Sequence, residues 1–286
     1  MANEPGLRDR PGGVVELPAR RAQLARIEHY FDQLPRTEAD VEAVGPFNLV
    51  ISRTPFHYPA RPAVDSARRI STRHLRRLER SCRDHHLPIE LEWIAELHPQ
   101  LESVVAESGW TVTSHPLLVV TRDHLVPRLR SQQVRIVDPG EPALLACRAV
   151  VEVAFSASAL AGTRERDRYL DAIDNDLVAY VHRRAREGST VTGAVVAQDD
   201  GVLAGGSYHR VGTMAEVVGV GTLPAYRRQG LGLDVVSLLC DHAFARGTQE
   251  VLLTARNQSV AQLYDKVGFV RVGTILVAQR GEPDDR

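Results

Sequence analysis

The sequence is poor in several residue types whose scarcity argues against whole classes of protein. It has a single lysine, Lys266, and only three cysteines, Cys82, Cys147 and Cys240, which stand far apart. Without a C-x-x-C pair, these thiols fit neither a disulfide framework nor a zinc site. We therefore expect no metal centre, and three buried thiols in a reducing compartment.

Net charge and long apolar runs are also lacking. The 35 basic and 36 acidic residues leave a formal charge of −1 over 286 residues. A chain without a strong field does not gather nucleic acid or anionic membrane, so neither is expected as a partner. No stretch approaches the roughly 18 apolar residues that span a bilayer, and the first residues lack the apolar region of a signal peptide. We expect a soluble, cytoplasmic protein.

The chain is long enough for two ordinary domains, and 43% of its residues are hydrophobic, enough to build real cores. Residues 1–20 are rich in Pro, Gly and Arg and predict a flexible tail. The charged segment 121–133, interrupted by Pro127, is interpreted as a linker. It divides a first domain over 21–125 from a second over 134–286.

Helical and strand periodicities alternate along the chain and predict an α/β fold with a mixed sheet. In the first domain the patterns predict helices over 21–31, 65–85 and 99–108, strands over 47–52 and 89–94, and a strand pair within 110–120. In the second domain they predict strands over 134–137, 191–198, 202–210, 214–221, 250–254 and 270–277. Its helices are predicted over 142–156, 164–173, 177–187, 230–246 and 258–267. The turn Asp199-Asp200-Gly201 is typical of a hairpin between two of these strands.

One segment of each domain can be laid over the other. Residues 80–120 and 238–278 both read helix, strand, helix, Gly-aromatic, strand. Cys82 to Trp110 spans 28 positions and Cys240 to Phe269 spans 29, so a single gap aligns them. Any two βαβ units share such a pattern, which leaves chance similarity open. If the repeat is real, the first copy has kept the scaffold and lost the glycine-rich turn.

That turn carries the chemistry. An apolar strand over 214–221 is followed by Pro224 and then by a loop whose two glycines, Gly230 and Gly232, open a helix. A helix N-terminus offers unpaired N–H groups and partial positive charge, and glycine lets the backbone approach a phosphate. The pattern therefore indicates a pyrophosphate cradle, although a helix start used only for packing would explain the same glycines. It is neither a Walker A motif nor a Rossmann fingerprint.

The run Arg227-Arg228-Gln229-Gly230-Leu231-Gly232 resembles [RQ]-x-x-G-x-[GA], the acyl-CoA signature of the GNAT acetyltransferase superfamily. Residues 220–226 look like the end of that family's fourth strand. Residues 257–269 are similar to its N-x-x-A-x-x-x-Y-x-x-x-G-F segment, with Ala261 one position late. The resemblance covers about residues 134–280 and, with the repeat, suggests a tandem arrangement whose N-terminal half is a degenerate GNAT-like domain.

The resemblance implies a sheet splayed between its fourth and fifth strands, with acetyl-CoA or another acyl-CoA in the splay. Backbone groups of Val220 and Thr222 would pair with the pantetheine arm, N–H groups over 228–233 would hold the pyrophosphate, and the Val220 N–H would donate to the thioester oxygen. The residues expected to bind the cofactor are Val218, Val220, Gly221, Thr222, Arg227, Arg228, Gln229, Gly230, Leu231, Gly232, Leu233 and Asn257.

Two residues are candidates for proton transfer. Strand alternation puts residues 216, 218, 220 and 222 on one face, so the Glu216 carboxylate would look into the same cleft, and the resemblance makes it the general base. A structural or substrate-anchoring carboxylate is the alternative. The resemblance makes Tyr264 the general acid toward the CoA sulfur, against the alternative of a core tyrosine. Asn257 would orient the pantetheine or cap the helix.

These residues together predict an acyltransferase that moves an acetyl or longer acyl group from acyl-CoA to a primary amine of a small molecule or peptide. A non-catalytic acyl-CoA-binding module, transfer to a hydroxyl, and transfer from a carrier protein stay open. We expect the acceptor to be selected by the helices over 142–187, with the N-terminal half as a further candidate. The chain is expected to be a monomer or a homodimer.

Overall fold

The computed structural model describes residues 17–64, 69–156 and 159–281. Most of the tail predicted over 1–20 lies outside these residues, but residues 17–20 already belong to the first helix, α1 (Leu17–Gln33). No helix in this part of the chain is long and apolar enough to cross a membrane.

The N-terminal half contains the elements that its apolar patterns predict, with two differences. After α1 come η1 (Leu34–Thr37), β1 (Ala39–Val44), β2 (Phe47–Ser52), β3 (Arg61–Pro62), α2 (Thr72–Asp84), β4 (Glu90–Ile94), α3 (Leu101–Glu107), β5 (Thr111–Thr121) and η2 (Arg122–His124). Strands β1 and β3 were not predicted. The strand pair predicted within 110–120 was wrong, because β5 is a single long strand.

The C-terminal half follows the predicted order throughout. Its elements are β6 (Val134–Ile136), α4 (Ala143–Ser156), α5 (Thr163–Asp171), α6 (Asn175–Arg186), β7 (Thr190–Ala197), β8 (Gly201–Val211), β9 (Met214–Thr222), η3 (Pro224–Tyr226), α7 (Leu231–Ala245), β10 (Glu250–Thr254), α8 (Gln258–Tyr264), η4 (Asp265–Val267) and β11 (Val270–Gln279). Strands β7 and β8 form the predicted antiparallel hairpin. Gly201 begins β8 with φ +68°, a conformation that glycine adopts without strain.

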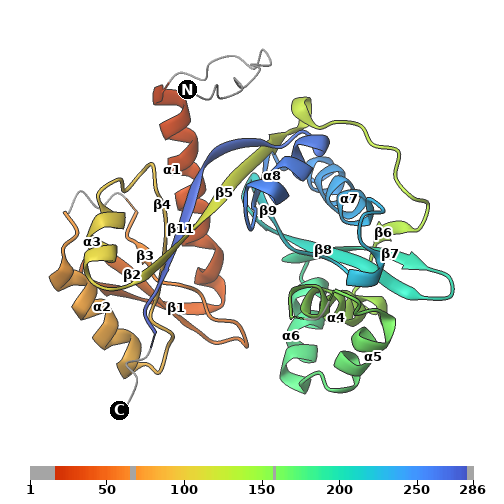
Figure 1. The fold of residues 1–286 in the computed structure, drawn as a ribbon, viewed down its shortest axis with the longest axis horizontal. Coiled ribbons are helices and arrows are strands. Elements are labelled where there is room, and N and C mark those ends of the chain that lie inside the picture. The colour runs from red at the N-terminus through yellow and green to blue at the C-terminus, as the bar shows by residue number, and fades with distance from the viewer. Residues whose placement is uncertain (1–16, 65–68, 157–158, 282–286) are drawn as a thin grey trace, which may run out of the picture.

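The two halves exchange strands. A small sheet has the order β1-β2-β3, and an eight-stranded mixed sheet has the order β4-β11-β5-β10-β9-β8-β7-β6. Strand β5 lies between β10 and β11, while β11 lies between β4 and β5, all antiparallel. Each half's long strand therefore pairs with the other half's short strand, and Figure 1 shows the two long strands running between the lobes. The division at 125–134 remains a prediction, and strand pairing crosses it.

This exchange supports the interpretation of residues 80–120 and 238–278 as a repeat. Units β4-α3-β5 and β10-α8-β11 have the same element order, and their strands occupy equivalent places about the shared β5–β11 pair. Such reciprocal pairing is a property of the topology, which chance similarity of two βαβ patterns does not require.

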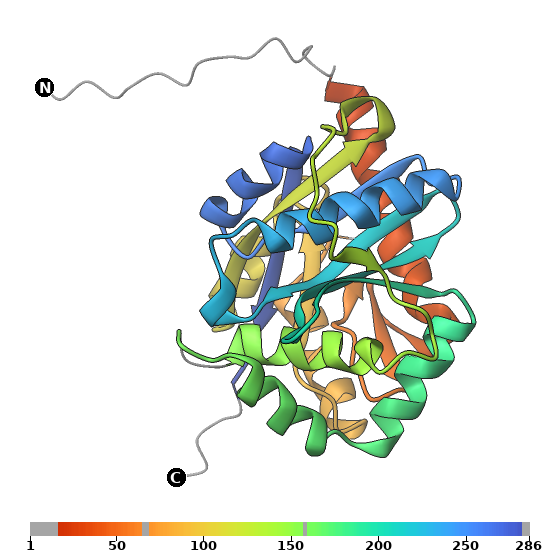
Figure 2. The same ribbon diagram turned by 90° about the vertical axis from the view of Figure 1, so that its right-hand side faces the viewer.

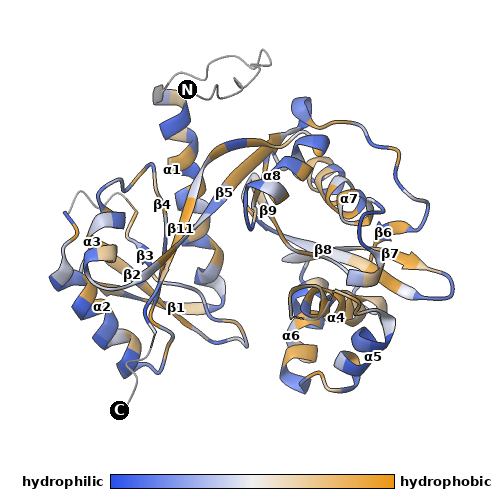
Figure 3. Cartoon of the chain, viewed as in Figure 1, coloured by the Kyte–Doolittle hydropathy of each residue, from blue (hydrophilic) through white to orange (hydrophobic). Residues whose placement is uncertain are grey.

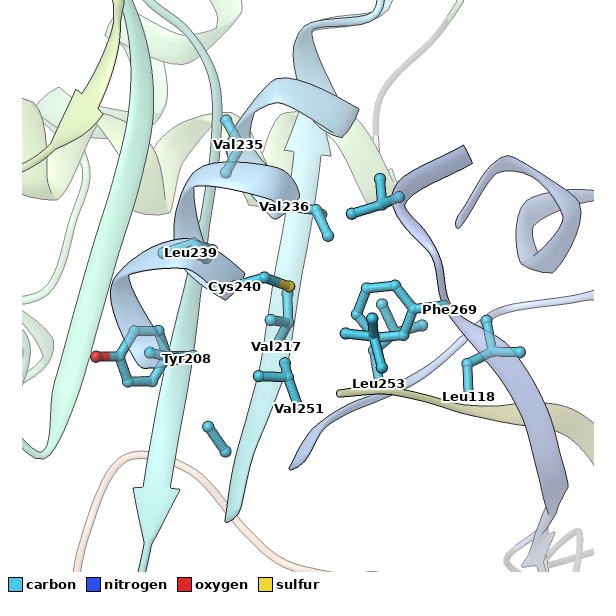
Figure 4. Close-up of a cluster of buried hydrophobic side chains, with 14 of the residues drawn as sticks. Leu118, Tyr208, Val217, Val235, Val236, Leu239, Cys240, Val251, Leu253 and Phe269 are labelled. Atoms are coloured by element: carbon cyan, nitrogen blue, oxygen red, sulfur yellow. The ribbon is translucent and has the colours of Figure 1, made fainter. Parts of the chain in front are cut away.

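Helices cover both faces of the C-terminal sheet. Helix α7 packs on one face through a cluster that includes Val217, Val235, Leu239, Val251 and Phe269 (Figure 4). Helix α4 packs on the other face, and Figure 2 shows α7 in blue and α4 to α6 in green on opposite sides. In Figure 3 the sheet and the inward sides of these helices are mainly apolar. The three cysteines are buried and unpaired, as predicted.

Strands β9 and β10 part after a short contact. They pair in parallel only over Met214–Glu216, opposite Glu250–Leu252, although β9 continues to Thr222. The predicted splay between the fourth and fifth strands of the C-terminal sheet is therefore present, and Glu216 stands where it begins.

Candidate active site

Glu216 faces a cavity between the two halves of the chain. The cavity has a volume of about 250 Å³ and is lined by β9 and β8 on one side and by α1, η1 and the β3 region on the other. His209 on β8 is the direct register partner of Glu216, so both side chains lie on the same face of the sheet. Glu216 therefore lines this cavity, and its assignment as the general base stays a prediction.

The surroundings of Glu216 favour its protonated form. Burial, and to a smaller extent the negative charge of Glu92, raise the pKa of Glu216 to about 8 against the opposing charge of Arg61. Arg61 and Glu92 are themselves ion-paired, and the Arg61 guanidinium stacks on Phe31 at 4.2 Å. Within the described residues no hydrogen bond or ion pair engages the Glu216 carboxylate, which leaves it available to a ligand.

His209 is positioned as a neutral neighbour. Burial, followed by the charge of Arg184, lowers the pKa of His209 to about 4, so the imidazole is uncharged near pH 7. Its Nδ1 lies 3.0 Å from Thr190 Oγ1, and its carbonyl accepts a hydrogen bond of 3.1 Å from Tyr30 of α1. The histidine therefore holds the two halves together beside Glu216 without adding charge.

The predicted shared face of residues 216, 218, 220 and 222 was wrong beyond Val218. The β8–β9 register shifts between Gly205 and Ser207, and Gly219 has φ +58°. This bulge reverses the alternation, so Val220 packs with the core under α7, while a Cβ on Gly219 or Gly221 would meet Val151 of α4. Neither Gly219 nor Val220 has a register partner in β8 or β10.

The loop before α7 has the geometry of an anion cradle. Arg228 and Gly230 both adopt left-handed backbone, with φ +65° and +82°, and Gly230 caps the helix. Gly232 packs against the end of β9, since a Cβ there would lie 3.3 Å from Thr222 Oγ1. Within the described residues we find no acceptor for the N–H groups of 228–233. The unpaired donors of a helix start therefore gather at the end of the splay.

The Arg227 guanidinium is held by backbone carbonyl groups beside the loop. Its Nη2 donates to the carbonyl of Ala154 at 2.7 Å and its Nε to the carbonyl of Thr222 at 3.4 Å. The arginine thereby joins α4 to the end of β9 and shapes the loop. The Gln229 side chain makes no hydrogen bond within the described part of the chain. Leu231 and Leu233 pack against the core.

Tyr264 and Asn257 occupy opposite ends of α8. The Tyr264 ring packs on Phe269 with centroids 6.0 Å apart, and burial raises the pKa of Tyr264 to about 12. Asn257 caps the helix by accepting a hydrogen bond of 3.0 Å from the Val260 N–H, which is one of its two predicted roles. Tyr264 does not line the cavity that contains Glu216.

Residues 153–269 match the model of the acetyltransferase (GNAT) family, a span that contains Glu216, the loop and Tyr264. The chain contains a GNAT domain. No curated protein sequence matches it. Of the similar solved structures, a GCN5-related N-acetyltransferase from Kribbella flavida shares 19% identity over 91% of this chain and 96% of its own, with TM-score 0.67. A tandem GNAT protein from the clavulanic acid biosynthesis pathway shares 15% identity over 83% of this chain and 79% of its own, with TM-score 0.52.

Among similar structures is also a functionally unknown conserved protein from Staphylococcus epidermidis, with 13% identity over 86% of this chain and 94% of its own, and TM-score 0.54. At such low identity these structures establish the fold alone. They extend over both halves, in line with a tandem GNAT arrangement. The family match places the chain in the GNAT N-acetyltransferase class of enzymes.

The GNAT domain has a cation near its loop that the sequence did not reveal. Arg128, in the segment interpreted as a linker, lies so close to Gly230 that a Cβ on this glycine would be 2.8 Å from its Nη2. Its Nε pairs with Asp234 Oδ1 at 2.6 Å, and Asp234 also accepts from the Ser131 N–H at 3.1 Å. Asp234 stands among apolar residues of α7, and a buried carboxylate requires a cationic or hydrogen-bonding partner. That residue was the one sign in the sequence that such a partner lies nearby.

The N-terminal half of this GNAT protein has no equivalent cradle among its described residues. Helix α2, the counterpart of α7, begins at Ser71, which is in extended backbone with φ −139°. The Ser71 N–H donates to His74 Nδ1 at 3.2 Å. The start of α2 is thus closed by its own residues, whereas the start of α7 is open and glycine-lined.

Proposed function

We propose that the chain transfers an acetyl group, or a longer acyl group, from acyl-CoA to a primary amine, with Glu216 as general base and Tyr264 as general acid. The observation that carries this proposal is the position of Glu216. Among the described residues its carboxyl group has no hydrogen-bond or ion-pair partner. It lies at the point where β9 leaves β10, in a cavity lined by residues of both halves.

The backbone around the splay fits an acyl-CoA. The open N–H groups of 228–233, with Arg128 beside Gly230, would hold the pyrophosphate. The backbone of Gly219 and Val220, which have no register partner in β8, would face the pantetheine arm, with the Val220 N–H donating to the thioester oxygen. When bound, acyl-CoA supplies an acyl group activated as a thioester.

The raised pKa of Glu216 suits the removal of a proton from an amine. An alkylammonium group has a pKa near that of lysine, about 10.4, so transfer to a carboxylate of pKa about 4.5 would cost about 8 kcal/mol. Transfer to Glu216, whose pKa is about 8, costs about 3 kcal/mol. The free amine then forms its bond to the acyl carbon as the carbon–sulfur bond breaks.

Tyr264 is protonated in the pH range where Glu216 is ionised. Burial raises its pKa to about 12, so the phenol retains the proton that the departing sulfur requires. The nitrogen loses two protons in all. The one taken from the ammonium by Glu216 goes to solvent, and the one lost as the amide forms balances the proton that Tyr264 gives to the sulfur. This assignment requires acyl-CoA to bring the sulfur to Tyr264, because the tyrosine lies outside the Glu216 cavity.

The test is the release of CoA thiol from acetyl-CoA with a series of primary amines, the alcohols of the same carbon skeletons, and no acceptor. We expect release with amines and none above background with the alcohols. Release only with alcohols would assign the domain to hydroxyl acylation. Tight acetyl-CoA binding by calorimetry, without release for any acceptor, would support a non-catalytic binding module instead.

A further inference from the structure

A second cavity continues from the one that contains Glu216. It has a volume of about 300 Å³ and lies between α4, α6 and the β7–β9 sheet, closed by Phe56 and Tyr58 from the N-terminal half. Tyr58, His209 and Val218 line both cavities, so the two adjoin, and we call them together the cleft. We call the part away from Glu216 the inner cavity. Its size is at the lower end of the range of small-molecule sites.

The walls of the inner cavity are mainly apolar and aromatic. Phe56 and Tyr180, from opposite halves, have ring centroids 5.4 Å apart, and Leu144, Val151 and Val181 supply aliphatic surface. Rings in such positions can stack on a planar ligand at centroid distances of about 4.5–7 Å. The cavity is therefore suited to an apolar body.

The charges of the inner cavity disfavour a second positive group. Its ionisable lining residues include Arg148 and Arg184, and no carboxylate is among the residues that line it. Arg184 is already compensated by Glu38 at 3.1 Å, and Arg148 is paired with Glu152 and lies over the Phe56 ring at 5.1 Å. A ligand ammonium here would be desolvated without a free counter-charge.

We propose that the acceptor is a monoamine with an apolar or aromatic body, which occupies the inner cavity while its amine lies at Glu216. This inference rests on the proposed function and makes it more specific. It also gives the N-terminal half a role, because Phe56 and Tyr58 supply one wall of the acceptor site. Polyamines and other polycationic amines are poor acceptors on this basis, since their second charge would enter the inner cavity.

Two amines of equal length test the inference with the unmodified chain. Pentylamine and 1,4-diaminobutane differ only by a terminal ammonium in place of a methyl group. With saturating acetyl-CoA we expect kcat/KM for pentylamine to exceed that for the diamine by about 100-fold or more, with 2-phenylethylamine at least equal to pentylamine. Equal or better use of the diamine would overturn the inference and leave the proposed function intact. Turnover of no amine would overturn both.

A variant should change the preference in the predicted direction. Val181→Asp places a carboxylate among the residues that line the inner cavity, and we expect it to narrow the pentylamine-to-diamine ratio by about tenfold or more. Leu160→Asp makes the same chemical change at a side chain that is 87% exposed and outside the cleft, and should leave the ratio unchanged. An unchanged ratio in folded Val181→Asp, or equal changes in both variants, would contradict the placement of the acceptor body.

Discussion

The protonation of Glu216 leads to a quantitative prediction about the pH dependence of turnover. Because its pKa lies near 8, the ionised fraction rises from about 0.01 at about pH 6 to about 0.5 at about pH 8. If the carboxylate is the base, the rate at saturating substrates rises about 50-fold over this interval and levels off above it. Glu216→Gln should lower kcat by about 10²-fold or more and remove this rise.

The titration of the substrate amine also produces a rise with pH, so two neighbouring variants are needed as controls. Glu92→Gln removes a negative charge and frees Arg61, which should lower the pKa of Glu216 and move the rise to lower pH. Arg61→Gln should raise the pKa of Glu216 and move the rise to higher pH. The titration of an amine free in solution would not respond to either variant.

The assay is CoA-thiol release followed from about pH 5.5 to 9.5, with acetyl-CoA binding measured separately by calorimetry. Opposite displacements in Glu92→Gln and Arg61→Gln, with a flat profile in Glu216→Gln, are the expected result. A profile that stays in place in both controls, or that survives in Glu216→Gln, would refute the assignment of Glu216 as the base.

Four further substitutions test other parts of the structure. Tyr264→Phe should lower kcat by about 10²-fold while acetyl-CoA affinity, measured by calorimetry, is little changed; unaltered turnover would remove the tyrosine from the mechanism. Gly230→Ala strains a residue at φ +82° and should weaken acetyl-CoA binding about tenfold or more, and equal affinity would contradict the cradle. Gly268 has φ +101°, and in Gly268→Ala the methyl group would lie 2.0 Å from the His124 carbonyl oxygen. We expect chemical denaturation to show that the free energy of unfolding falls by more than about 3 kcal/mol. Glu38→Ala leaves the Arg184 side chain, 8% exposed, without its counter-charge. The free energy of unfolding should fall by about 3–5 kcal/mol, and an unchanged value would mean that this ion pair does not stabilise the contact between the halves.

Local patterns in the sequence predict most helices and strands, because the spacing of apolar residues differs between the two. The run Glu250–Thr254 is bounded by Gly247 and Asn257, and β10 has the predicted bounds. Strand β1 was missed because its sequence, ADVEAV, carries two acidic residues among six. Strand β5 was read as a pair because His115-Pro116 interrupts it, yet β10 pairs only from Leu117 onward. Pro116, which has no N–H to donate, therefore lies just outside the part of β5 that pairs with β10.

The arrangement of the candidate site depends on contacts that periodicity does not encode. The bulge at Gly219 turns Val220 to the opposite face, and a rule of strict alternation has no means to anticipate it. The exchange of β5 and β11 pairs residues more than 150 positions apart, such as Val119 and Val270. The wall that Phe56 and Tyr58 contribute follows from that exchange. The motifs predicted roles for the loop, Glu216 and Tyr264, whereas the cleft that we propose for the acceptor could be found only in the structure.

The most direct test of the account is to identify the product by mass spectrometry. The chain is incubated with acetyl-CoA and 2-phenylethylamine, and both the amine and the CoA are analysed. We predict that the amine gains one acetyl group for each CoA released, at a rate well above that of Glu216→Gln. The account would be contradicted if acetyl-CoA binds to the chain while 2-phenylethylamine and the other primary amines remain unmodified.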